Sequence, residues 1–138
     1  MSAQTAGQLT KREIAARVKA VVSNGHWMIR ADNNGISHGG FRWAPVGVWT
    51  EAPDWNPLPI CGGGLHGQSK KHGGLGNAGR LVFCEYDPRD VVELNKKIKV
   101  RRARILMVNQ LPAGLKVGGS LDLRGTQITT LPADLKVG

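Results

Sequence analysis

The stretch RLVFCEYD, residues 80–87, is the most strand-like segment of the chain, and the prediction of its fold class starts from it. It concentrates aliphatic and aromatic side chains that suit a pleated, buried surface. RARILMVNQ, residues 102–110, is apolar enough to lie centrally in a sheet, and PRDVVELNKKIKV, residues 88–100, is typical of a turn followed by a short strand. Several strands with one early helix predict an α+β fold with a mostly antiparallel sheet.

The segment before the first of these strands predicts a hairpin. Residues 26–30 suit a strand, the Asp-Asn-Asn-Gly sequence at residues 32–35 is a turn signal, and residues 41–43 suit a returning strand.

An amphipathic helix is predicted at residues 10–25, TKREIAARVKAVVSNG. Thr10 and Glu13 form a capping box at its start, and Gly25 provides a left-handed exit. Its apolar residues fall on one face at helical spacing: Ile14, Val18, Val21 and Val22. Residues 1–9 are small and polar, and we expect a flexible N-terminus there.

Two long loops are expected between the helix and residue 80. Residues 44–67 contain Pro45, Pro53, Pro57 and Pro59, which disfavour regular strand pairing, while Trp side chains can anchor the loop by burial. Residues 61–79 hold eight glycines among nineteen residues, which predicts a mobile or ligand-binding loop.

The chain closes on a repeat. LPAGLKVG (residues 111–118) and LPADLKVG (residues 131–138) match at seven of eight positions with a period of 20. The pattern resembles short bacterial leucine-rich repeats, and fewer than about three such units cannot bury an apolar face alone. Either the array continues beyond Gly138 or it packs on the rest of the chain. We expect a core domain at residues 10–110 and a partial repeat at residues 111–138. The side chains expected to bury against the core are Leu115, Val117, Leu121 and Leu123.

Positive charge is concentrated in the second half of the chain. The formal net charge is +9, and residues 70–138 carry thirteen Lys and Arg against six Asp and Glu. The run KKIKVRRAR, residues 96–104, contains six bases and no acid, which favours contact with phosphate groups or with an acidic protein surface, although a solvated basic strand would look the same. The predicted binding residues are Lys70, Lys71, Lys96, Lys97, Lys99, Arg101, Arg102 and Arg104.

Side chains that suit metal or covalent chemistry are few. Cys61, His66, His72 and Cys84 are candidate zinc ligands, but their spacing contains no C-x2-C pair, so we expect no metal. Cys61 beside His66 is the alternative of a nucleophile with its base. The Gly-rich stretches GGGLHG and GGLGNAG match no nucleotide-binding fingerprint, so no cofactor is expected either.

The segments FRWAPVGVWTEAPDWNP (residues 41–57), CGGGLHG (residues 61–67) and VFCEYDPRDVVELNKKIKVRRARIL (residues 82–106) resemble a module of phage and prophage proteins. In that family the module is often followed by pentapeptide or leucine-rich repeats. The resemblance covers roughly residues 36–138. It implies a phage origin and, by context, an anti-defence role such as that of an anti-CRISPR protein, but it implies no reaction.

A strand followed by GGLHG and VFCEYD is also similar to ADP-ribosyltransferase-like domains. That resemblance implies NAD as the substrate, with His38, Arg42, His66 and Glu85 as catalytic candidates.

The leading hypothesis is therefore a small phage-type protein, more a binder than an enzyme. It would act in the host cytoplasm on a host defence protein or ribonucleoprotein complex, or on nucleic acid itself, through its basic surface. There is no apolar run of membrane-spanning length. An ADP-ribosyltransferase-like enzyme and a virion assembly module are the alternatives, and the sequence leaves the oligomeric state open.

Overall fold

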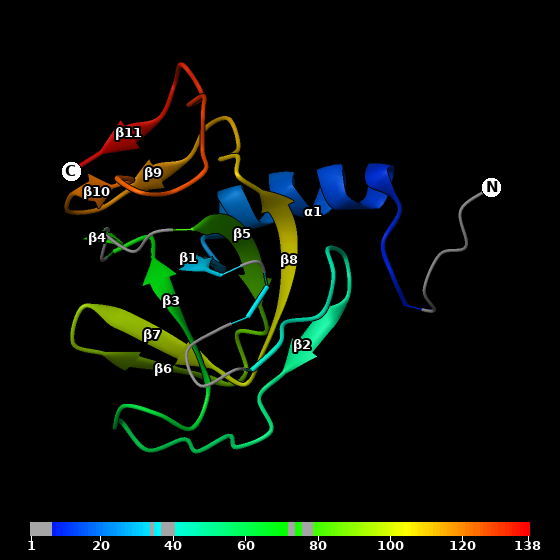
Figure 1. Cartoon of the computed structure of the whole chain (residues 1–138), viewed down its shortest axis with the longest axis vertical. Helices are drawn as coiled ribbons and strands as arrows, with labels where there is room; N and C mark the ends of the chain where they lie inside the picture. The colour runs from blue at the N-terminus through cyan, green and yellow to red at the C-terminus, as the bar shows by residue number, and fades with distance from the viewer. Residues whose placement is uncertain (1–6, 34, 37–40, 72–73, 76–78) are drawn as a thin grey trace.

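A computed structural model describes residues 7–33, 35–36, 41–71, 74–75 and 79–138 (Figure 1). Within these residues, one helix and a set of short strands confirm the α+β class. The elements in chain order are α1 (Lys11–Asn24), β1 (Trp27–Asp32), β2 (Trp49–Glu51), β3 (Leu65–Ser69), β4 (Gly74–Leu75), β5 (Arg80–Tyr86), β6 (Val91–Leu94), β7 (Lys97–Val100), β8 (Arg102–Val108), β9 (Lys116–Val117), β10 (Leu121–Asp122) and β11 (Lys136–Val137).

Seven strands form one antiparallel sheet in the order β2-β8-β5-β1-β3-β7-β6. The predicted strands at residues 80–87 and 102–110 correspond to β5 and β8. β5 lies between β8 and β1, and its residues 81–85 are all buried, as expected of a central strand. The short pairs β10-β4 and β11-β9 are parallel and lie apart from this sheet.

The helix forms as the sequence predicts. Glu13 N–H donates to Thr10 Oγ1 and Thr10 N–H donates to Glu13 Oε1, so both halves of the capping box are present. Gly25 ends the helix with a φ of 81°. Val21 is buried in a core cluster, and the rest of the predicted apolar face packs on the same cluster. α1 is neither long enough nor apolar enough to cross a membrane.

The hairpin predicted for residues 26–43 is wrong. The turn after β1 does form, since Gly35 N–H donates to Asp32 Oδ1 at 2.9 Å. Residues 41–43 form no strand, however, and Arg42 makes only an isolated bridge with Ile36. β1 instead pairs with β5 along its full length, and the buried carboxylate of Asp32 accepts two hydrogen bonds of 3.0 Å from Arg80 of β5. This pairing, together with β3 on the other side, leaves β1 no free edge.

The glycine-rich loop prediction is also wrong at residues 65–69, which form β3 between β1 and β7. Close packing against β1 explains why this strand contains a glycine, Gly67. A Cβ atom there would meet Met28 Sδ at 2.6 Å, so the two strands approach closely only because the side chain is absent.

The C-terminal segment shares a core with the sheet. Leu111, Leu115 and Val117 belong to the cluster of buried residues that contains Trp27 and Phe83. Two further residues of the predicted buried set, Leu121 and Leu123, are half-buried and pack against this cluster. In Figure 1 the strands β9, β10 and β11 lie with α1 at one end of the long axis, and the β6-β7 hairpin lies toward the other.

Candidate functional site

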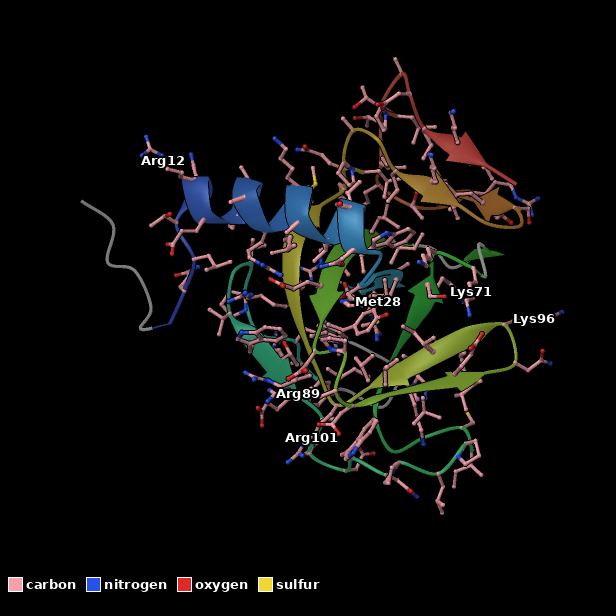
Figure 2. The ribbon with its side chains drawn as sticks, turned by 180° about the vertical axis from the view of Figure 1, so that it is seen from behind. Arg12, Met28, Lys71, Arg89, Lys96 and Arg101 are labelled. Atoms are coloured by element: carbon pink, nitrogen blue, oxygen red, sulfur yellow. The ribbon has the colours of Figure 1, made fainter. Side chains whose placement is uncertain are left out.

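The basic run at residues 96–104 does not form one continuous row of cations. Lys96 occupies the turn between β6 and β7, whereas Arg101 lies at the other end of β7, as Figure 2 shows. Lys99 is fully buried, and its Nζ donates to the Gly62 carbonyl at 3.0 Å and lies 5.9 Å from the centre of the Trp55 ring. The run divides because the chain leaves β7 at Arg101 and enters β8, which pairs with different neighbours.

Arg102 and Arg104 form a stack on β8 and β2. Their guanidinium carbons lie 4.3 and 4.5 Å from the Trp49 ring centre. Arg102 pairs with Glu51 at 3.2 Å, and Arg104 pairs with Glu85 at 2.7 Å. Each arginine therefore has an acidic partner and an aromatic surface, which reduces the charge that it offers to a ligand.

Glu85 is held by two arginines. Its carboxylate accepts hydrogen bonds from Arg17 at 2.9 Å and from Arg104 at 2.9 Å, and the residue is 3% exposed. It lines a different cleft from His66, and β1 separates their strands in the sheet. Arg42 is exposed. The fourth candidate of the enzyme hypothesis, His38, lies outside the described residues.

Four lysines gather around one cleft of about 460 Å³, which we call the lysine cleft. Lys70 and Lys71 follow the end of β3, where Figure 2 shows Lys71, while Lys116 belongs to β9 and Lys136 to β11. The other lining residues are Val117, Gly118, Val137 and Gly138. No Asp or Glu side chain lines this cleft among the residues that the structure describes.

Backbone contacts hold the lysine cleft together. Gly118 N–H donates to the Lys70 carbonyl at 2.6 Å, and a Cβ at Gly118 would meet that carbonyl oxygen at 2.9 Å. Lys116 and Lys136 are register partners in the parallel β9-β11 pair. The period of 20 in the sequence therefore has a direct consequence, because equivalent residues of the two LKVG segments lie side by side.

The lysines of this cleft differ in their surroundings. Lys71 makes an ion pair of 3.7 Å with Glu93, and both side chains are more than half exposed. The Lys70 side chain lies over Gly25 at the C-terminal end of α1, where a cation complements the helix dipole. Within the described part of the chain, Lys116 and Lys136 have no carboxylate at ion-pair distance.

A second cleft, of about 480 Å³, brings together several other predicted residues. Cys61, His66 and Lys97 line it together with Arg30 of β1, and we call it the arginine cup. Lys97 Nζ lies 3.4 Å from Cys61 Sγ. The remaining lining residues are Phe41, Pro53, Asp54, Gly62, Gly63, Gly64 and Leu65. The sequence analysis does not identify Arg30, although an arginine directly after the apolar residues 27–29 of the strand WMIRAD is a signal.

The imidazole of His66 reports a positive field in the arginine cup. Burial lowers the pKa of His66 below its usual value, and the nearby cations Lys97, Arg30 and Lys99 lower it further. The Gly62 N–H donates to His66 Nε2 at 3.3 Å, which requires that nitrogen to be unprotonated. His66 Nε2 therefore accepts from the Gly62 backbone, while the side-chain contact of Cys61 Sγ is with Lys97 Nζ.

The three candidate zinc ligands that the structure describes do not form a cluster. Cys84 is buried in β5, and burial raises the pKa of its thiol to about 12. Cys61 is exposed and lies in the arginine cup with His66, while His72 lies outside the described residues. No group of three or more His, Cys, Asp or Glu side chains suited to a metal occurs among the described residues.

Comparison with known proteins found no relative. No family model matches the chain, and no curated protein and no solved structure matches it either.

Proposed function

We propose that this protein binds nucleic acid through the lysine cleft and acts as a binder rather than as an enzyme. The observation that carries the proposal is the convergence of four lysines, from three separate segments, on one cleft that no described Asp or Glu side chain lines. Lysine is a compact point charge that suits phosphate oxygens without reading base edges. The expected contact is therefore with the backbone and insensitive to sequence.

The pairing of Lys116 with Lys136 supports an anionic ligand. Two like charges directly opposite each other on neighbouring strands are destabilising. A row of phosphates beside them would remove that repulsion and release counterions. The proposed leucine-rich character of the repeat adds a reason for the arrangement, because a repeating unit places its lysines at a regular strand spacing of about 4.8 Å.

Salt dependence is the most direct test of this proposal. Binding of a fluorescein-labelled single-stranded RNA of roughly 20 nucleotides, longer than most single-strand sites, is followed by polarisation at several salt concentrations. Four phosphate contacts predict a slope of log K against log[salt] of about −3 for a single strand. The double variant Lys116→Gln/Lys136→Gln should reduce the slope by about 1.4 and weaken binding at low salt.

The matched control is Lys11→Gln/Lys19→Gln, which removes the same charge from exposed positions of α1. It should leave the slope within error of the parent protein. Equal effects of the two double variants would show that only net charge matters and would overturn the cleft as the site. Polyglutamate that binds as tightly as RNA would overturn the choice of nucleic acid over an acidic protein.

We extend the proposal to the partner in the cell. The resemblance of residues 36–138 to a phage module supports a host ribonucleoprotein, such as a defence complex, as the source of the nucleic acid. Capture from host extract by the tagged protein should then depend on RNA. The captured complex should be lost after nuclease treatment and with Lys116→Gln/Lys136→Gln. Retention of the same host protein after nuclease treatment would contradict this partner class.

A further inference from the structure

We propose that the arginine cup is a second binding site, separate from the lysine cleft, for a small organic anion. The recognised group is a carboxylate or a phosphate carried on an apolar body. The two sites lie at opposite ends of β3, because Cys61 and His66 are at or before its start while Lys70 and Lys71 follow its end. They share no lining residue.

Arg30 is the central observation. Its Nη1 donates to the His66 carbonyl at 3.0 Å and its guanidinium lies 4.6 Å from the Trp43 ring centre. Its Nε is buried without a hydrogen-bond partner, and no carboxylate pairs with Arg30 among the described residues. Burial lowers the pKa of Arg30, and Asp32 partly opposes this effect. A guanidinium with an unpartnered Nε–H can form a further charge-assisted hydrogen bond to a carboxylate or phosphate.

The surrounding charge favours an anion. Lys97 lines the same cleft, and Lys99 is buried behind it with its Nζ on the Gly62 carbonyl. Among the described lining residues, Asp54 is the single carboxylate, so the cations outnumber it. Burial lowers the pKa of His66, and these same three cations lower it further, as their positive charge requires.

The walls of the cup define the rest of the ligand. Phe41, Pro53 and Leu65 provide apolar surface. Gly62 and Gly63 have φ angles of 89° and 67°, a left-handed conformation that glycine adopts readily. Because they carry no side chain, their backbone can lie directly against a ligand in the cup. A volume of about 480 Å³ falls within the range of sites for small organic molecules. A single-ring anion therefore fits better than a bare inorganic ion.

Two matched reporters in the intact protein test this proposal. The Arg30 Nε–H resonance is observed by ¹H–¹⁵N NMR during titration with phenyl phosphate, with benzoate and with neutral benzyl alcohol up to roughly 10 mM, a range that covers millimolar affinities. Exposed Cys61 is labelled with N-ethylmaleimide, which leaves buried Cys84 unmodified. We expect at least one anion to shift the Arg30 resonance and to slow Cys61 labelling, and benzyl alcohol to do neither.

The variant Lys97→Gln tests the cup, and Lys96→Gln is its matched control, because it removes the same charge at the neighbouring position in the chain. Lys97 lines the cup, while Lys96 lies at the tip of the β6-β7 hairpin and points away from the molecule in Figure 2. Lys97→Gln should weaken the anion at least fivefold, and Lys96→Gln should leave its affinity unchanged. Absence of any anion effect on Arg30, equal weakening by both variants, or equal binding of benzyl alcohol would each overturn the proposal. A preference for phenyl phosphate identifies a phosphate ligand, and a preference for benzoate identifies a carboxylate.

Discussion

Gly67 in β3 lies directly against Met28 of β1, and both residues are buried. In the sequence this glycine is one of several in a stretch that predicts a loop. In the structure its lack of a side chain is what allows β3 to join the sheet. The same residue type therefore marks a turn at one position and a close strand contact at another.

Gly67→Ala should destabilise the fold by about 1–3 kcal/mol, because its Cβ would lie 2.6 Å from Met28 Sδ and the packed core must shift. Urea denaturation measures the loss. Met28→Ala alone should also destabilise the protein, but the double variant should lose less than the sum of the two. Strictly additive losses would show that the two side chains do not compete for the same space.

His66 makes the stability of the folded state depend on pH. Its pKa is lowered by burial and by Lys97, Arg30 and Lys99, with Asp54 opposing them weakly. Between the folded pKa and the unfolded value of about 6.5, the unfolded chain binds more protons, so stability falls as the pH decreases through that window. His66→Gln should flatten this part of the pH profile of the unfolding free energy. An unchanged profile would show that other groups carry the dependence.

At the scale of elements, α1 is the most local feature of the fold. Its start depends on two hydrogen bonds between Thr10 and Glu13, and its end on the left-handed Gly25. These contacts lie within a few residues of one another, which is why the sequence predicts them completely.

Thr10→Ala should cost about 1 kcal/mol of stability, because it leaves the Glu13 N–H without its acceptor. Thr10→Ser retains the hydroxyl and should cost much less. Thermal denaturation of the three proteins compares them directly. Equal losses for Ala and Ser would mean that the methyl group, and not the cap, stabilises the helix.

At the scale of the whole molecule, one core cluster joins the helix, the sheet and the C-terminal segment. Leu115 is fully buried in it together with Val21 and Phe83. The repeat is too short to bury its own apolar face, and this shared core supplies what further repeats would otherwise provide.

Leu115→Ala should therefore destabilise the whole protein by about 2–5 kcal/mol and lower the melting temperature in a single transition. All four Trp residues lie outside residues 111–138, so Trp fluorescence reports the rest of the fold. It should give a curve that coincides with far-ultraviolet circular dichroism. An early separate transition of the C-terminal segment, with the Trp fluorescence unchanged, would show that residues 111–138 unfold independently.

Some residues of the candidate sites can be predicted from the local sequence, and others depend on segments far apart in the chain. Charge density predicts Lys70, Lys71 and Lys97. The period of the repeat relates Lys116 to Lys136, although charge density alone does not identify them. Arg30 was not found, because its role depends on loop residues 61–64 and on β7, which the chain reaches only much later.

The sequence by itself determined the capped helix, the strands β5 and β8, and the period of 20 in the C-terminal repeat, since each follows from short-range spacing or from a repeat. Only the tertiary structure decided that residues 65–69 form a strand, that Lys99 is buried, and that the basic run is divided between separate surfaces. These outcomes depend on which strands become neighbours. That choice is made by packing across the sheet, over distances in the chain that local patterns do not encode.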